Sequence, residues 1–338
     1  MNAIKSQGWC WQAAGEPDAL ILTDLTLPAP GPGEVVVENR VIAINPVDWK
    51  LIEWGHPDWQ PGQVPGVDGM GVIVALGEGV HHLRLGSRVA YHTDLRRHGS
   101  FARHTCVPAR ALLAVPEALS DEAAAAFPCP GLTAWQALAK LPDLHGEAVL
   151  LTGAASNVGR YAVSLALARG ARVFASADAR HHDALRRLGV QVADYHDTDW
   201  LATLRAANGG EPFHAIIDLV SSAQASELCH ALGYYGHLVA VLGRVEQSPL
   251  PPFTRCLSLH EIALGAQHAH GSARQWQQLV QAGESMLTAM VSGAMPTAPL
   301  AVRDFAALPA ALAEAKRQGG GRKFLLRVAL FPKSASKS

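Results

Sequence analysis

The stretch VLLTGAASNVGRYAVSLALARGARVFAS, residues 149–176, decides the fold. An apolar run ends in a turn of small residues, a helical pattern follows, and a second apolar run closes the stretch. This order predicts a strand, a turn, a helix and a second strand. Free N–H groups and the helix dipole favour an anion at such a turn, and small residues let the backbone approach a pyrophosphate. The stretch therefore predicts a dinucleotide-binding turn.

The glycine fingerprint of this turn is incomplete. Ala154, Ser156 and Gly159 stand at the G-x-G-x-x-G positions, so the alternative is an ordinary turn between a strand and a helix. The flanking strands and the βα units that follow favour the dinucleotide site. Gly159 would let the helix pack tightly on the strand. We expect Asn157 to tolerate a positive φ, and its amide to be able to bond a phosphate or a ribose.

The residues after the second strand bear on the choice between NAD and NADP. Asp178 lies 19 residues after Gly159, and its carboxylate could accept from both ribose hydroxyls, which favours NAD. Arg180 follows, with His181 and His182, and these side chains could meet a 2′-phosphate. Both cofactors stay open on this pattern alone, and Arg180 as a solvated loop residue is the third possibility.

Two kinds of pattern divide the rest of the chain. Up to about residue 120, short β-rich runs at 34–45, 71–77, 88–93 and 101–108 are separated by Gly and Pro, which predicts a compact β-domain resembling a partly open barrel. Ser120 begins a helical pattern. Strand candidates at 148–152, 171–176, 214–220, 237–243 and 262–266 then alternate with helices, which predicts a parallel α/β sheet. A helix around 308–318 and a strand at 323–328 return to the first domain, and the tail 331–338 looks frayed.

Composition limits the class of protein. The chain has 338 residues, with 49% hydrophobic residues, 17% charged residues and a net charge of −1, so it is globular and gives no electrostatic reason to bind nucleic acid. Five cysteines without a CxxC favour a reducing compartment. The first residues lack the apolar core of a signal peptide, and no apolar run has the length of a membrane span. We expect a cytoplasmic protein without a membrane partner.

Five ordered segments resemble the medium-chain dehydrogenase/reductase superfamily, in particular its zinc-free quinone oxidoreductase and enoyl reductase branch. They are INPVDWKL, VPGVDGMGVIVALGEGV, GSFARHTCVP, FPCPGLTAWQAL and GAASNVGRYAVSLA. The resemblance implies an α/β protein with two domains. We expect a GroES-like β-barrel substrate domain, residues 1–122 and 296–338, and a Rossmann cofactor domain with a doubly wound parallel sheet, residues 123–295. The active site would lie in the cleft between them.

The same resemblance allows the zinc-dependent branch to be weighed. Where those enzymes carry the first Cys and the His of the catalytic zinc, this chain has Asn45 and Val67. Cys129 remains at the third position, and one thiolate does not hold a catalytic zinc. We therefore expect no metal site, and Cys129 to be a small packed residue.

The resemblance also implies the site residues. Thr133 matches a threonine beside the nicotinamide, and Lys50 lies in a segment that lines cofactor and substrate. Asn45, Lys50 and Thr133 are the candidate catalytic residues, with Lys50 as the cation near the substrate oxygen. The full set expected to contact the cofactor is Val47, Asp48, Thr133, Ala155, Ser156, Asn157, Val158, Asp178, Arg180, His181, Tyr195, Gly243, Lys323 and Phe324.

These residues imply a reaction. We expect hydride transfer from NADPH, with NADH as the alternative cofactor, to a small electrophile, either a quinone or an α,β-unsaturated carbonyl compound. Such acceptors move charge onto oxygen, where hydrogen-bond donors can stabilise it without a metal. Two alternative functions are a zinc-type alcohol dehydrogenase and a dinucleotide-binding protein without catalysis. The resemblance also implies a homodimer, with the segment 261–267 at the sheet edge where two subunits could pair.

Overall fold

The computed structural model describes residues 3–329, and its internal contacts divide the chain into two compact units. The first unit takes the residues up to Cys129 and those from Gly265 onward, and the second takes Pro130–Leu264. The second unit is thus an insertion in the first, as the sequence suggested. Its boundaries fall at 129/130 and 264/265 instead of the expected 122/123 and 295/296. The expected frayed tail, 331–338, lies outside the described residues.

The first unit is built on a bent, mainly antiparallel sheet. The sheet runs in the order β14-β15-β3-β4-β5-β7, with β6 also paired to β3, while β1 and β2 form a separate antiparallel pair. The expected strands at 34–45, 71–77, 88–93 and 101–108 are confirmed as β3, β4, β5 and β6. The strands of this unit are β1 (Ile4–Cys10), β2 (Ile21–Leu27), β3 (Glu34–Ala43), β4 (Asp68–Leu76), β5 (Arg88–His92), β6 (His104–Pro108), β7 (Leu112–Ala114), β14 (Leu300–Asp304) and β15 (Lys323–Arg327).

The last strand returns to the first unit, as expected. In β15, Leu325 pairs with Ala43 and Leu326 pairs with Ile42 of β3. All four side chains are buried, and the part of β3 that pairs with β15, Val41–Ala43, is wholly apolar. The central strand of this unit is therefore completed by residues from the far end of the chain.

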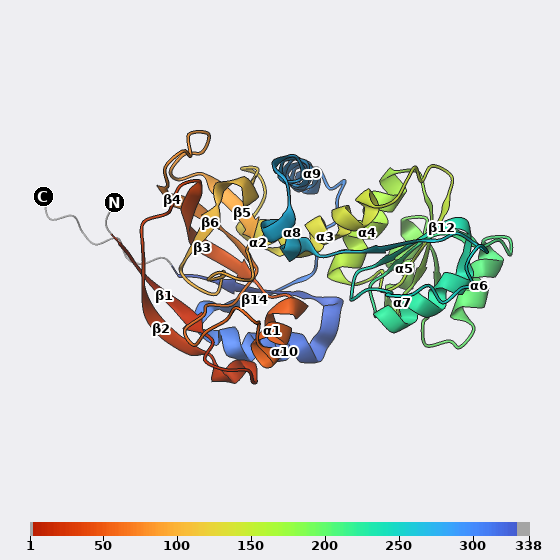
Figure 1. Ribbon diagram of the computed structural model, residues 1–338, viewed down its shortest axis with the longest axis horizontal. Coiled ribbons are helices and arrows are strands. Elements are labelled where there is room, and N and C mark those ends of the chain that lie inside the picture. The colour runs from red at the N-terminus through yellow and green to blue at the C-terminus, as the bar shows by residue number, and fades with distance from the viewer. Residues whose placement is uncertain (1–2, 330–338) are drawn as a thin grey trace, which may run out of the picture. The chain divides into compact units, whose positions relative to one another are not determined.

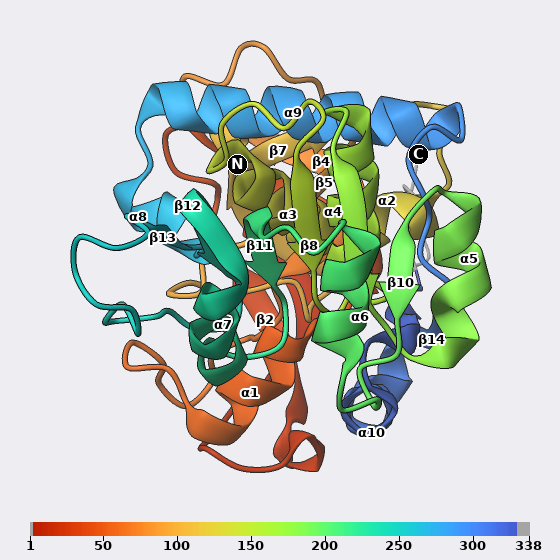
Figure 2. The ribbon, with the colours of Figure 1, turned by 90° about the vertical axis from the view of Figure 1, so that its right-hand side faces the viewer.

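Five helices belong to the first unit. Ser120 begins α2 (Asp121–Ala126), as expected, and its hydroxyl accepts from the N–H of Ala123 at 3.2 Å. α1 (Pro46–Trp54) and α10 (Leu308–Gln318) lie side by side (Figures 1 and 2). The other two are α8 (Gln267–His270) and α9 (Ala273–Val291). α9 packs on β7 and its Glu284 accepts from the N–H of Ala114 at 2.9 Å, so this helix belongs to the first unit.

The second unit is a six-stranded parallel sheet in the order β10-β9-β8-β11-β12-β13, part of which faces the viewer in Figure 2. Counted along the chain, this is the order 3-2-1-4-5-6 of the doubly wound dinucleotide-binding fold, so the expected fold class is confirmed. The strands are β8 (Ala148–Leu151), β9 (Arg172–Ser176), β10 (Gln191–Ala193), β11 (Phe213–Asp218), β12 (Leu232–Ala240) and β13 (Ser258–Glu261). The helices are α4 (Asn157–Ala168), α5 (His182–Arg187), α6 (Trp200–Ala207) and α7 (Ser222–Leu228), while α3 (Pro128–Ala139) crosses the unit boundary.

One strand expectation is wrong. The segment 262–266 is not a strand: the edge strand β13 ends at Glu261, and Leu264–Ala266 forms a 3₁₀ turn. β13 has one neighbour, β12, and Leu259 is the single apolar residue of the strand, so it gives no apolar run. The apolar residues that follow β13 lead into the 3₁₀ turn, where Leu264 is buried. Among the described residues, no helix is long and apolar enough to cross a bilayer.

Candidate active site

The turn between β8 and α4 has the geometry of a phosphate cradle. Gly153 has a φ of +62°, and Ser156 caps α4 by accepting from the N–H of Gly159 at 3.0 Å. A Cβ added to Gly159 would lie 2.4 Å from the carbonyl oxygen of Gly153 and 2.6 Å from that of Ala154. The close approach of helix and strand predicted for Gly159 is thus observed, and it leaves no room for a side chain.

Asn157 plays a different part from the one expected. It is the first residue of α4 and does not have a positive φ; the residue in that conformation is Gly153. The helix begins at Asn157, so its backbone takes helical angles, and the positive φ of the turn falls four residues earlier, at Gly153. Its side-chain Oδ1 is buried without a hydrogen-bond partner among residues 3–329. Ala155, Ser156, Asn157 and Val158 are all half-buried, so the first turn of α4 is partly open to a ligand.

The carboxyl ends of the two central strands meet beside this turn. Thr152 follows β8 and donates its hydroxyl to Asp218 at the end of β11, at 2.7 Å. Asp218 also accepts from the N–H groups of Val220 and Ser221, which opens α7. A Cβ on Gly243 would lie 3.2 Å from Ser222. The turn, Gly243 and the start of α7 therefore gather where the strand order reverses, which is where open α/β sheets bind ligands.

Basic groups surround the residues that follow β9. Asp178 accepts from the N–H of Arg180 at 3.0 Å and pairs with its Nε at 3.2 Å. Partial burial lowers the pKa of His181, and the nearby Arg160 and Arg180 guanidinium groups lower it further. The Arg160 side chain is half-buried with a pKa lowered by that burial, and its Nε donates to the carbonyl of Ala155. The structure thus adds Arg160 to the predicted group, and the Asp178 carboxylate is already paired with Arg180.

Tyr195 lies after β10 and is exposed. Its ring is tilted against that of His196, with the centroids 4.2 Å apart. His196 is in turn held by Asp194, at 2.7 Å from Nδ1 to Oδ1. Asp194 also accepts from the N–H of Ala179, which joins this loop to the segment that contains Arg180. The predicted Tyr195 is therefore on the same edge of the second unit as the basic group.

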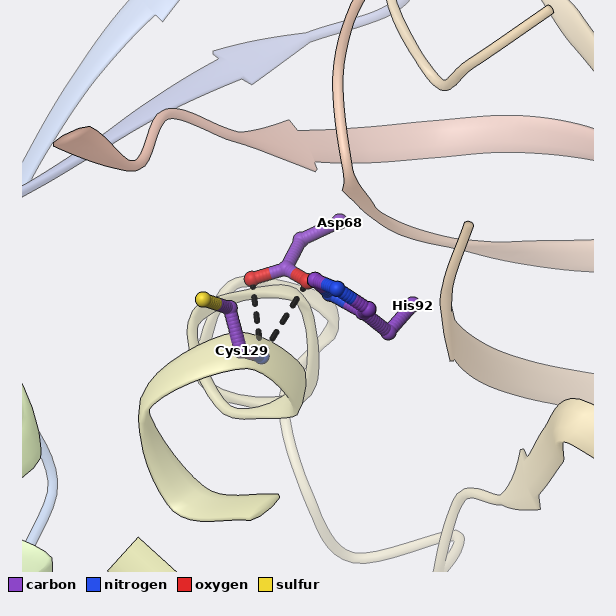
Figure 3. Close-up of side chains that lie close together, drawn as sticks. All are labelled: Asp68, His92 and Cys129. Carbon is purple, nitrogen blue, oxygen red and sulfur yellow. Dashed lines mark hydrogen bonds and ion pairs between the residues drawn. The ribbon is translucent and has the colours of Figure 1, made fainter. Parts of the chain in front are cut away.

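A second set of polar groups is buried in the first unit around Asp68, at the start of β4. Oδ1 of Asp68 accepts from Nδ1 of His92 at 2.9 Å, and Oδ2 accepts from the amide of Asn45 at 2.9 Å. The backbone N–H of Cys129 reaches both oxygens, at 3.1 and 3.0 Å (Figure 3). Lys323 Nζ lies 3.6 Å from Oδ2 and donates to the amide oxygen of Asn45. We call Asn45, Asp48, Asp68, His92 and Lys323 the buried polar cluster.

Asp48 completes the cluster from α1. Its two oxygens accept from the N–H groups of Asn45 at 2.6 Å and Val67 at 3.1 Å. Burial raises the pKa of Asp48 to about 8 and the nearby Asp68 raises it too, while the Asn45 and Val67 N–H groups and Lys323 oppose the shift. The backbone bonds fix the start of α1 against the loop before β4.

The structure brings three of the predicted residues together and separates others. Asn45, Asp48 and Lys323 meet in the buried polar cluster, where the Lys323 side chain is only 1% exposed. Lys50 is two residues after Asp48 and so points from another face of α1, with its Nζ 5.9 Å from the ring centre of Trp54.

Three further predicted residues are buried or half-buried in β15, α3 and α1. Phe324 is packed in the core with Ile42 and Ile44. Thr133 is buried in α3. Val47 is half-buried on α1.

Sequence reasoning missed Asp68 and His92. They face each other directly in the antiparallel ladder of β4 and β5, where Asp68 is the register partner of His92. Strand pairing brings them together across 24 residues, and the sequence signal was only that a carboxylate and an imidazole each stood at one end of an apolar strand. Cys129 was expected only to pack, and its backbone N–H also donates to the Asp68 carboxylate.

The fold family raises the question of a zinc ion, and the residues present do not fit one. Asp68, His92 and Cys129 offer an oxygen, a nitrogen and a sulfur within 4.8 Å of one another. The Asp68 carboxylate, however, already accepts from three neighbouring residues and lies beside the Lys323 ammonium. Figure 3 shows this carboxylate between the sulfur and the imidazole ring. An ion would have to displace these donors and stand next to a fixed positive charge.

Two cavities of the first unit lie away from the predicted residues. One of about 240 Å³ is lined by residues of β2, β6 and the loop before β6, including Glu34, Arg97 and Cys106. The other, of about 500 Å³, lies between α9 and the β5–β7 region. Neither contains a member of the buried polar cluster, so the site is defined by its side chains rather than by these cavities.

Comparisons with known proteins agree with both units. Residues 31–117 match the family described as alcohol dehydrogenase GroES-like domain, and residues 157–285 match the family described as zinc-binding dehydrogenase. The trans-enoyl reductase caaB of Aspergillus niger is 30% identical over 296 residues, which cover 81% of this chain and 76% of that protein. The trans-enoyl reductase tazE of Aspergillus terreus is 33% identical over 192 residues, covering 51% of this chain and 63% of the relative.

A solved structure gives the same fold. The quinone oxidoreductase from Coxiella burnetii superposes with a TM-score of 0.80 at 21% identity, covering 96% of this chain and all of the other. The chain spans less than two thirds of the length of several curated relatives that it matches, such as tazE. The chain belongs to the medium-chain dehydrogenase/reductase superfamily.

Proposed function

We propose that this protein uses NADPH to reduce an electron-poor double bond, in an α,β-unsaturated carbonyl compound or a quinone, without zinc. The observation that carries the proposal is the Asp68 carboxylate, which is held by Lys323, Asn45 and His92 and so leaves no place for a metal. Without a metal, this site has no Lewis acid to polarise a simple alcohol or ketone, whereas a conjugated acceptor places its charge on an oxygen that hydrogen-bond donors can stabilise. The names of caaB and tazE as trans-enoyl reductases support this class of substrate.

The second unit supports NADPH over NADH. The dinucleotide supplies the hydride when bound. Arg160 and Arg180 both lie close enough to His181 to lower its pKa, and Asp178 is paired with Arg180. A free carboxylate would favour the two ribose hydroxyls of NADH, whereas an excess of basic groups favours a 2′-phosphate. The cradle formed by Gly153, Ser156 and Gly159 is the pyrophosphate site in this proposal.

The other residues have defined parts in the proposal. Thr133 places the nicotinamide, and Lys50 supplies the positive charge beside the substrate oxygen. Lys50 lies over Trp54, outside the buried polar cluster, and is only half-buried, whereas Lys323 is fully enclosed. Asn45 uses both ends of its amide within the cluster, which assigns it to holding Lys323 and Asp68 in place. Val47, Asp48 and Phe324 support these segments from α1 and β15.

The test is oxidation of NADPH and of NADH against a panel of quinones, enals, enones, simple ketones and alcohols, with metal content measured on the same sample. We expect turnover with NADPH and the conjugated acceptors, and a zinc content well below one per chain. Stoichiometric zinc with alcohol oxidation would instead establish a zinc-type alcohol dehydrogenase. Tight NADPH binding without turnover on the whole panel would establish a dinucleotide-binding protein without catalysis.

We also infer a homodimer. β13 (Ser258–Glu261) has a partner strand on one side only, which leaves a row of backbone N–H and C=O groups for a second copy. The segment involved is therefore Ser258–Glu261 instead of the expected 261–267. Light scattering of the purified protein, with a proline placed at Leu259, tests this assembly.

A further inference from the structure

We propose that His92, oriented by Asp68, is the catalytic acid that protonates the substrate after hydride transfer. This inference rests on the proposed reductase function and names a residue that the sequence did not indicate. Its basis is a buried imidazole and carboxylate pair, with the second ring nitrogen left open.

The pair is fixed from several sides. Asp68 is fully buried, and its Oδ1 lies 2.9 Å from Nδ1 of His92. Because Asp68 also accepts from the Cys129 N–H and from Asn45, its carboxylate plane cannot rotate freely. The backbone oxygen of His92 accepts from His268 Nε2 at 3.0 Å, which fixes the end of β5. The imidazole is therefore held in one orientation with Nδ1 as donor.

The other ring nitrogen has no such partner. Nε2 of His92 makes no hydrogen bond within residues 3–329, and it is not among the enclosed polar atoms that lack a partner. The side chain keeps 9% of its surface exposed and Nε2 is not enclosed, so a substrate can reach this nitrogen. A purely structural ion pair between β4 and β5 would need only the Nδ1 side of the ring.

The charges of the cluster allow the imidazolium form. Asp68 and Asp48 carry up to two negative charges, and Lys323 carries one positive charge 3.6 Å from Asp68. With Asp48 ionised, protonated His92 brings the cluster to neutrality. With Asp48 protonated, neutral His92 does the same. The cluster therefore holds one proton that can reside on His92 without leaving an unpaired buried charge.

The reduction adds a hydride to one carbon of the double bond and a proton to the other. A hydride forms the new bond to the β-carbon of an α,β-unsaturated carbonyl, and the electron pair of the double bond moves to the carbonyl oxygen as an enolate. The Nε2–H bond of His92 then breaks, a C–H bond forms at the α-carbon, and the carbonyl is restored. His92 is left neutral, still donating Nδ1–H to Asp68, and solvent returns its proton. Asp68 is a positioning residue in this step.

The test compares His92→Asn with the unchanged protein, using NADPH and an α-methyl enal such as 2-methyl-2-pentenal. The asparagine amide can keep the bond to Asp68, because its nitrogen replaces Nδ1, but it has nothing at the Nε2 position. His104→Asn is the matched control, since His104 is also a buried strand histidine, bonded to Ser6 at 3.1 Å through Nδ1. Thermal unfolding and NADPH binding are measured on all three proteins.

We expect His92→Asn to lower kcat about 100-fold or more while NADPH affinity and unfolding temperature stay close to those of the control. The product should also be racemic at the α-carbon, because solvent would then protonate the enolate from both faces. Deuterium transfer from labelled NADPH to the β-carbon should persist. Unchanged kcat and unchanged enantiomeric excess in His92→Asn would overturn the role of His92 and leave the reductase function standing. A wild-type protein inert toward every conjugated acceptor would overturn both.

Discussion

The ammonium of Lys323 lies 3.6 Å from Oδ2 of Asp68, and both side chains are almost completely buried. The two residues are separated by the whole second unit along the chain, and β15 brings them together by pairing with β3. A buried ion pair is costly to break from one side, because the remaining charge is left without a partner. The same ion pair therefore contributes both to the stability of the first unit and to the charge balance of the buried polar cluster.

Replacing Lys323 with Met should destabilise the protein by about 3 kcal/mol, since Asp68 would keep a buried charge without its cation. Urea unfolding at pH 7 measures the loss. Lys316→Met is the control, because Lys316 pairs with Glu16 and Glu53 on the surface and should change the unfolding midpoint far less. The double change Asp68→Asn with Lys323→Met should recover much of the loss. Equal unfolding midpoints for Lys323→Met and the control would contradict the idea that Lys323 compensates the buried charge of Asp68.

Replacing Gly159 with Ala should weaken NADPH binding about tenfold or more, because the added Cβ would collide with the carbonyl oxygens of Gly153 and Ala154. The turn must open to relieve the collision, and the N–H groups then lose their aim at the pyrophosphate. Titration followed by nicotinamide fluorescence gives the affinity. Ser164→Ala on the same helix should bind as the unchanged protein does. Normal binding by Gly159→Ala would place the phosphate elsewhere.

Replacing Arg180 with Ala should raise the KM for NADPH about tenfold and leave the KM for NADH nearly unchanged. The substitution removes a charge-assisted bond to the 2′-phosphate of NADPH, and NADH has no such phosphate. Steady-state kinetics with both cofactors measure the ratio. Arg186→Ala, an exposed arginine of the same segment that pairs with Asp183, serves as the comparison. A parallel loss with both cofactors would remove the 2′-phosphate role from Arg180.

The stability of the protein should fall as the pH is lowered from about 6.5 toward 4, in part through His268. Burial lowers the pKa of His268 to about 4, and its Nδ1 is enclosed without a partner among the described residues. Between these pH values the unfolded chain binds a proton that the folded chain refuses, so acid favours unfolding. Urea midpoints at several pH values measure the slope. His268→Gln can keep the bond to the His92 carbonyl and should show a shallower slope; an identical slope would exclude His268 as a contributor.

The sequence predicted those parts of the fold that depend on local patterns. The β8–α4 turn, the helix start at Ser120 and the helix at 308–318 each follow from neighbouring residues, and all were placed correctly. The edge strand was misplaced because Ser258–Glu261 has little apolar character of its own. The positive φ was assigned to Asn157 instead of Gly153, since the sequence does not show where the turn ends and the helix begins.

The sequence predicted only part of the candidate site. Asn45, Asp48 and Lys323 were named through motifs, but their meeting around Asp68 depends on strand register and on the return of β15. Lys323 is predicted to contact the cofactor, and the structure adds that its ammonium bonds to Asn45 and lies beside Asp68. His92 could not be found from local pattern, because its partner lies on the neighbouring strand.

The pairing of Leu325 with Ala43 also has a consequence for biosynthesis. As the chain leaves the ribosome, Pro130–Leu264 is complete well before β15 emerges, so the nucleotide-binding half can form while the other half still waits for its last strand. Contacts that span so much of the polypeptide close slowly. During that interval the unpaired flank of β3 near Ile42 is exposed, which makes it the place where a chaperone would be needed most.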